Sequence, residues 1–172
     1  MKHANIILVG FMGTGKSATG RRLAKRLGRR FVDMDAVIEK RAGRTIPEIF
    51  ARDGEPRFRE LERALVRELA GQRDLVIAAG GGVVLNPENV RDFEQAGFVV
   101  CLTAPAEIIL RRVGHLQNRP LLEGGDKEQR LRDLLEKRRP LYEAIARRVE
   151  TADLSPDEVA ERILALYDQA KV

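Results

Sequence analysis

The chain has 172 residues, with 31 Lys and Arg, 26 Asp and Glu, 44% apolar residues, one Cys and no Trp. This length predicts a single domain over residues 1–172 that buries a core. Abundant charges of both signs exclude a disordered polyelectrolyte. The longest charge-free stretches are short and interrupted by glycines, which excludes the membrane-spanning helix of roughly 20 apolar residues. The apolar run before Gly10 is also too short for a signal peptide.

Cysteine and charge usage narrow the class further. Cys101 has no partner for an internal disulfide and sits among apolar residues, so we expect a buried thiol in a cytoplasmic protein. The net charge of +5 is concentrated in residues 111–148, which hold 11 Lys and Arg against 6 Asp and Glu. Such a block binds nucleic acid, closes over a small polyanion, or forms a solvated helix face. The solvated face is favoured for most of its residues.

Short apolar runs predict the strands. Residues 5–9 form a β-branched run that stops at Gly10, as a buried parallel strand would. Phe31 and Val32 predict a brief second strand, and residues 75–79 and 98–102 predict two more. Because helical patterns separate these runs, we expect an α/β domain whose parallel sheet is covered on both faces.

Helix starts and stops are marked by capping residues. A helical pattern over residues 16–27 ends at Gly28. Capping-box spacing predicts helix starts at Thr45, Asp126 and Ser155, and Asn86 followed by proline predicts another. A stripe at helical spacing is typical of a core-facing helix, and it comprises Phe58, Leu61, Leu65 and Leu69.

The first predicted strand runs into a phosphate-binding loop. Residues 10–17, Gly-Phe-Met-Gly-Thr-Gly-Lys-Ser, match G-x-x-x-x-G-K-[ST] between a strand and a helix. Glycines let the backbone wrap a phosphate with its N–H groups inward, and the following helix adds the positive end of its dipole. Lys16 supplies a point charge for the β- and γ-phosphates, and the Ser17 hydroxyl is a ligand for Mg²⁺.

Acids and glycines follow the later strands. Asp33 and Asp35 come after the second strand, at the sheet edge where parallel strands end and ligands bind. They are candidate ligands of the phosphate–metal site, or alternatively a helix cap with a first-turn acid. Three consecutive glycines, residues 80–82, indicate a close approach to the backbone. Arg59 is a candidate site residue oriented by Glu62, or a surface arginine with an i,i+3 partner.

A second arginine lies in an expected flap. Residues 114–124 have the composition of a loop between two helices, and Arg119 lies within them. From there Arg119 would reach the transferring phosphoryl group, as an arginine finger does in cis. A loop arginine without a function is the alternative.

Taken together, these residues resemble the shikimate kinases, compact members of the nucleoside-monophosphate-kinase-like phosphate-loop fold. The resemblance extends from Gly10 to about Tyr142 and rests on spaced motifs at residues 10–17, 33–35, 58–62, 78–84, 118–122 and 138–142. It implies a five-stranded parallel sheet in order 2-3-1-4-5 with a lid at about residues 113–125. It also implies transfer of the γ-phosphoryl of Mg·ATP to the 3-hydroxyl of shikimate, giving shikimate 3-phosphate and ADP for aromatic amino acid biosynthesis.

The resemblance assigns roles residue by residue. Arg59 and Arg138 would hold the shikimate carboxylate, and Asp35 would bind the hydroxyls and act as the base. Arg112 would lie against adenine, and Arg119 would close on the phosphates. Gly81 and Gly82 would bind shikimate through their backbone N–H groups, and Ser17 and Asp33 would bind Mg²⁺. The residues that would bind the nucleotide phosphates are Gly13, Thr14, Gly15, Lys16, Ser17 and Ala18. The walls of the pocket would be Phe50, Phe58, Pro120 and Leu121.

The resemblance also implies ATP and Mg²⁺ as cofactors, shikimate as the small-molecule partner, and a monomer that binds neither nucleic acid nor membrane. Ala78 departs from members with a Ser that orders the metal's waters, and Leu154 from members with an Arg near adenine. One rival is a kinase of the same fold that acts on gluconate or a nucleoside monophosphate. The other is a nucleic-acid-binding ATPase, against which the 5% aromatic content argues, since it offers little for base stacking.

Overall fold

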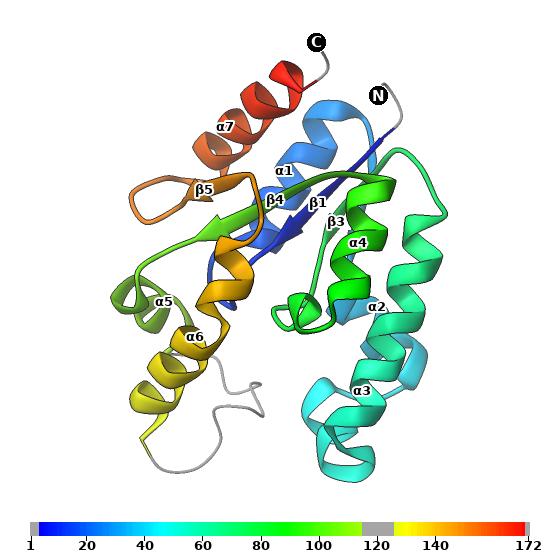
Figure 1. The fold of residues 1–172 in the computed structure, drawn as a ribbon, viewed down its shortest axis with the longest axis vertical. Helices are drawn as coiled ribbons and strands as arrows, with labels where there is room; N and C mark the ends of the chain where they lie inside the picture. Colours follow the sequence, from blue (N-terminus) through cyan, green and yellow to red (C-terminus); the bar gives the residue numbers. More distant parts are fainter. Residues whose placement is uncertain (1–3, 115–125, 171–172) are drawn as a thin grey trace.

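A computed structural model describes residues 4–114 and 126–170 of the chain. A strand is present at each of the four predicted apolar runs, and a further strand near the C-terminal end is one that no run predicts (Figure 1). Along the chain the strands and helices are β1 (Asn5–Val9), α1 (Lys16–Leu27), β2 (Arg30–Asp33), α2 (Met34–Ala42), α3 (Ile46–Ala70), β3 (Leu75–Ala78), the 3-10 helix η1 (Val83–Leu85), α4 (Pro87–Ala96), β4 (Gly97–Thr103), α5 (Ala106–Val113), α6 (Lys127–Glu143), β5 (Arg148–Glu150) and α7 (Pro156–Gln169).

The five strands form one parallel sheet in the order β2-β3-β1-β4-β5, which confirms the order that the family resemblance implies. The three-residue β5 buries only Val149, so no apolar run in the sequence marks it. The central strands are buried along their whole length, as expected for a sheet covered on both faces.

Successive side chains of the central strand feed two cores, one on each face of the sheet. Leu8 packs with Leu23 of α1 and with the buried face of α7. Ile7 points the other way and joins Leu65 of α3 and Phe93 of α4. Figure 1 shows the resulting layers, with α1 and α7 together on one side of the sheet and α3, α4 and α6 on the other. Among the described helices, none has the apolar length that crossing a bilayer requires.

Local capping chemistry sets the helix starts where the sequence predicts them. Thr45 and Ser155 each form a complete capping box at the start of α3 and α7. The Asp126 and Asn86 side chains accept backbone N–H groups at the start of α6 and α4. Each cap satisfies a helix N–H group that has no partner within the helix.

Helix α3 begins after Thr45, as predicted, and is interrupted by a kink at Gly54. Gly54 has φ 80° and ψ 167°, so helical backbone on either side of it meets at a kink. Such a left-handed φ favours glycine, and Pro56 then lies in the first turn of the second helical segment. The kink separates the start of α3 from the part that carries Arg59 and Glu62.

The carboxyl ends of β1, β2 and β3 lie at one edge of the sheet. Asp33, the last residue of β2, is paired in register with Ala78, the last residue of β3. Leu8 of β1 is paired with the same Ala78. The phosphate loop, Asp33 and the three glycines therefore leave the sheet side by side, as the sequence predicts from strand polarity.

Candidate active site

The phosphate loop, residues 10–17, joins β1 to α1, and α1 begins at Lys16. The Lys16 ammonium donates hydrogen bonds to the carbonyl oxygens of Gly10 at 2.7 Å and Phe11 at 2.9 Å. The Thr14 hydroxyl donates to the Phe11 carbonyl at 2.8 Å, and Thr14 is buried. These contacts hold the loop in a closed turn with the first N–H groups of α1 at its mouth, which is the arrangement that binds anions.

Ser17 and Asp33 meet at the mouth of this loop. The Ser17 hydroxyl donates to Oδ2 of Asp33 at 2.6 Å. The other carboxylate oxygen of Asp33 accepts the Ala36 N–H at 3.3 Å and caps α2. One oxygen of Asp33 therefore caps the helix, as the capping interpretation predicts, and the other faces Ser17, while its role as a metal ligand stays a prediction. A hydroxyl beside a carboxylate is the oxygen donor set that Mg²⁺ takes from proteins, together with phosphate oxygens.

The three glycines after β3 lie against charged side chains. A β-carbon on Gly80 would lie 2.9 Å from Oδ1 of Asp35 and 2.9 Å from Oε2 of Glu62. A β-carbon on Gly82 would overlap the guanidinium of Arg59. The glycines thus let two carboxylates and one guanidinium come within contact distance of the backbone, which is the close approach that the sequence predicts.

A buried ion pair orients Arg59. Its Nη1 donates to Oε1 of Glu62 at 2.9 Å, and its Nη2 donates to Glu55 at 3.1 Å. The Glu62 side chain is 2% exposed, and its Oε2 has no hydrogen-bond partner among the described residues. Burial raises the pKa of Glu62, the Arg59 charge opposes that shift, and the nearby Asp35 charge adds to it.

Sequence reasoning gave Glu62 only an orienting role. Its unpartnered, buried oxygen beside Asp35 makes it part of the site itself. The only sign of Glu62 in the sequence was its i,i+3 spacing from Arg59. Burial distinguishes this ion pair from a surface pair, and the residue pattern does not show burial.

Helix α6 brings Arg138 near Glu62 and Tyr142. Arg138 is 4% exposed, and its charge acts on the pKa of Glu62 and of Tyr142. The Tyr142 hydroxyl, one turn further along α6, donates to the Gly81 carbonyl at 2.6 Å. Burial raises the pKa of Tyr142 to about 12, although the adjacent Arg138 opposes the shift. Tyr142 was not predicted as a site residue, and it fixes Gly81 through the backbone.

Arg112 is committed to three hydrogen bonds. Its Nη1 donates to the Gly13 carbonyl at 3.1 Å and to the Thr151 hydroxyl at 3.0 Å. Its Nη2 donates to the Thr151 carbonyl at 2.8 Å. The guanidinium therefore joins α5 to the phosphate loop and to the segment after β5, on the side of the loop away from the three glycines.

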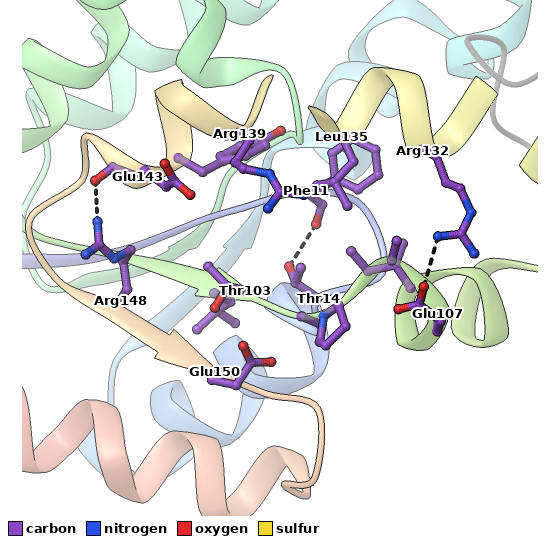
Figure 2. Close-up of a pocket in the computed structure, with 16 residues that line it drawn as sticks. Phe11, Thr14, Thr103, Glu107, Arg132, Leu135, Arg139, Glu143, Arg148 and Glu150 are labelled. Carbon is purple, nitrogen blue, oxygen red and sulfur yellow. Dashed lines mark hydrogen bonds and ion pairs between the residues drawn. The ribbon is translucent and has the colours of Figure 1, made fainter. Parts of the chain in front are cut away.

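A cavity of about 930 Å³ lies beside the phosphate loop, between the end of β4, α5, α6 and β5 (Figure 2). The Glu107–Arg132 ion pair of 2.9 Å joins α5 to α6 beside it, and Arg148 reaches the Glu143 carbonyl. Thr14 is the one sequence-predicted site residue among its described lining residues.

Three predicted residues lie outside the described part of the chain, namely Arg119, Pro120 and Leu121. Most of the expected lid at residues 113–125 lies there too. The other two residues predicted as pocket walls, Phe50 and Phe58, pack against each other with ring centroids 5.1 Å apart.

Comparisons with known proteins agree with this geometry. The family model for shikimate kinase matches residues 12–168. A shikimate kinase of Pelotomaculum thermopropionicum is 52% identical over 160 residues, which is 93% of each chain. A structure of shikimate kinase from Acinetobacter baumannii in complex with shikimate is 44% identical, covers 98% of this chain and 95% of its own, and superposes with a TM-score of 0.93.

A gluconokinase from Sinorhizobium meliloti is only 18% identical, with a TM-score of 0.60 over 98% of this chain and 95% of its own, so it shares the fold alone. The family model, the relatives and the similar solved structures agree on one family, and the chain belongs to the shikimate kinase family.

Proposed function

We propose that this chain transfers the γ-phosphoryl of Mg·ATP to the 3-hydroxyl of shikimate, giving shikimate 3-phosphate and ADP. The observation that carries the proposal is the convergence of Asp35, Glu62 and Arg59 on Gly80 and Gly82, beside the phosphate loop. A small carboxylate with several hydroxyls needs cations at one end and hydrogen-bond acceptors at the other, and this site offers both.

The nucleotide side is formed by the phosphate loop and the start of α1. Backbone N–H groups from Gly13 to Ala18 bind the phosphates, and the N-terminal end of the α1 dipole adds positive potential. Lys16, held beside the loop by its bonds to Gly10 and Phe11, neutralises the β- and γ-phosphates. ATP is the phosphoryl donor throughout the family to which the chain belongs.

The Ser17 hydroxyl and the Asp33 carboxylate would hold Mg²⁺. Their oxygens lie 2.6 Å apart at the loop's mouth, which fits a hard cation that takes few protein ligands. When bound, the ion neutralises charge on the β- and γ-phosphates. Ala78, in the position where some family members have Ser, leaves this chain without that hydroxyl near the site.

The acceptor side positions the substrate for attack. Arg59 and Arg138 hold the carboxylate of shikimate, and the N–H groups of Gly81 and Gly82 bind it from the backbone. Glu62 and Glu55 fix the Arg59 guanidinium, and Tyr142 fixes Gly81. Charge-assisted contacts of this kind are strong and directional, so they set which hydroxyl faces the phosphate loop.

The chemical step forms one bond and breaks one. The 3-hydroxyl oxygen bonds to the γ-phosphorus while the bond from that phosphorus to the bridging oxygen breaks and ADP leaves. Asp35 accepts the hydroxyl proton, because its carboxylate lies against Gly80 beside the loop. Lys16 stabilises the charge that develops on the transferring group, and Arg119 assists from the lid. Positioning and charge stabilisation supply most of the catalysis in such a reaction.

The test is ADP release from Mg·ATP with shikimate, gluconate, nucleoside monophosphates or no acceptor. We expect turnover with shikimate and only background release with the others. Turnover with gluconate or a nucleotide instead would overturn the acceptor assignment while leaving the nucleotide side intact. Nucleotide binding without turnover on any acceptor would contradict the proposal as a whole.

A further inference from the structure

Thr151, the first residue after β5, lies where three parts of the nucleotide side meet. It is 2% exposed. Its hydroxyl lies 3.1 Å from the Thr14 carbonyl of the phosphate loop and 3.1 Å from the Thr103 carbonyl at the end of β4. One hydroxyl proton serves these two acceptors, so the hydroxyl is shared between the loop and the sheet.

The backbone of Thr151 is engaged as well. Its N–H donates to the Thr103 carbonyl at 2.9 Å, and its carbonyl accepts from Nη2 of Arg112 at 2.8 Å and from the Leu154 N–H at 3.3 Å. Nη1 of Arg112 reaches the Thr151 hydroxyl and the Gly13 carbonyl. Every polar group of Thr151 therefore has a partner, and the partners belong to the phosphate loop, β4, α5 and the segment between β5 and α7.

These contacts fix the plane of the Arg112 guanidinium. Nη1 and Nη2 are both held by Gly13 or Thr151, and a planar guanidinium held in this way stacks through its flat faces. A guanidinium that stacks on a nucleotide base must keep a defined orientation, and here that orientation comes from Thr151.

We infer that Thr151 is a positioning residue for nucleotide binding. It holds the phosphate loop and Arg112 in a fixed relative position, so that the loop can bind the phosphates while Arg112 contacts the base. This inference rests on the proposed function, since it assumes that the phosphate loop binds ATP and that Arg112 lies against adenine, as the family resemblance implies. Thr151 acts through Gly13, Thr14 and Arg112 and touches no reacting atom.

The substitutions that isolate this role are Thr151→Val and Thr151→Ser. Valine keeps the side-chain shape and removes the hydroxyl. The Thr14 carbonyl and one Arg112 N–H then lose this partner, while the Thr103 carbonyl keeps the backbone N–H of residue 151. Serine keeps the hydroxyl. We expect Thr151→Val to weaken binding of Mg·ADP about tenfold, with binding of shikimate changed by less than about twofold. Thr151→Ser restores Mg·ADP binding to within about twofold of the unsubstituted chain.

A control separates positioning from loss of stability. Asn5 is fully buried at the opposite edge of the sheet, where its side chain bonds to Gln72 and Leu75. Asn5→Ala therefore destabilises the fold without touching the nucleotide side. We expect it to leave Mg·ADP binding unchanged at temperatures where it is folded.

Binding is measured by calorimetry, with thermal melting of each variant. Wild-type Mg·ADP affinity in Thr151→Val, equal weakening in Asn5→Ala, or a serine variant as weak as the valine variant would each overturn the inference. If valine does not fold, Thr151→Ala carries the same expectation. Calorimetry with Mg·ADP needs no turnover. If the proposed reaction fails, the failure is seen in the acceptor assay, and the binding of Mg·ADP by the Thr151 variants can still be compared.

Discussion

Gly82 lies so close to Arg59 that no larger residue fits without moving the guanidinium. Its φ of −94° is one that any residue adopts, so the close approach alone requires glycine. Gly81 differs, because a β-carbon there would make only ordinary contacts, the nearest 3.5 Å from the Met12 backbone nitrogen. Position 81 therefore has room for a β-carbon, whereas position 82 has room for one only if Arg59 moves.

This difference predicts the effect of two alanine substitutions. Gly82→Ala displaces Arg59 from Glu62 and should raise the KM for shikimate about ten- to a hundredfold, with a smaller effect on the KM for ATP. Gly81→Ala is the matched control and should change either KM by less than about threefold. Equal losses in both variants would show that flexibility of the run, and not space for Arg59, is what matters.

Two buried groups make the fold sensitive to alkali. Burial raises the pKa of the Cys101 thiol from 9.0 to about 11 and that of Tyr142 from 10.0 to about 12. Each group loses its proton at a lower pH in the unfolded chain than in the folded chain. The stability that the protonated group contributes is therefore fully present below its pKa in the unfolded chain, and it is lost as the pH rises through its pKa in the folded chain.

We therefore expect the free energy of unfolding to fall by about 2–3 kcal/mol between pH 9 and 11 through Cys101, with Tyr142 continuing the loss up to pH 12. Urea denaturation over this range gives the slope. In Cys101→Ala the slope between pH 9 and 11 should become shallower, whatever the variant's overall stability. An unchanged slope would show that the thiol does not contribute.

At the scale of elements, contacts between residues close in sequence determine where the helices begin, and burial determines which residues of the basic block are not solvated. The Thr45, Asn86, Asp126 and Ser155 caps follow from residues within four positions of one another, which sequence alone displays. Among the described residues of the block 111–148, Arg132 of α6 forms exposed ion pairs with Glu107 of α5 and with Glu128, whereas Arg138 is buried.

The cap of α3 gives a prediction for stability. The Thr45 N–H donates to the Glu48 carboxylate at 2.8 Å, and the Glu48 N–H donates to the Thr45 hydroxyl. Thr45→Ala should lower the free energy of unfolding by about 0.5–2 kcal/mol, and Thr45→Asp, which can also cap, should recover most of it. Chemical denaturation measures both. A loss that aspartate does not recover would assign the effect to packing of the threonine methyl group.

Other elements could not be read from the sequence. β5 has three residues and one buried side chain, so it lacks an apolar run, and only the family resemblance implied it. The kink at Gly54 within α3 also went unpredicted, because an isolated glycine is tolerated within a helix and gives no sign of its φ. Both features depend on packing against other elements.

At the scale of the whole molecule, strand polarity does most to assemble the site. Because all strands are parallel, the phosphate loop, Asp33 and the glycine run emerge at one edge, and the sequence sufficed to place them together. Contacts between elements distant in sequence could not be predicted in this way. The bond between Thr151 and Thr14 spans 137 residues, and the bond between Tyr142 and Gly81 spans 61.

In the proposed function, α6 and α3 each supply one arginine, Arg138 and Arg59, to the carboxylate of shikimate. Arg138 is buried, whereas its neighbour Arg139 is exposed and paired with Glu136. The most direct measurement is calorimetric titration of shikimate into Arg138→Ala and Arg139→Ala, with Mg·ADP titrated into the same samples. We predict that Arg138→Ala weakens shikimate binding about 30- to 1000-fold with Mg·ADP binding retained, while Arg139→Ala binds both normally. Wild-type shikimate affinity in Arg138→Ala would contradict the assignment.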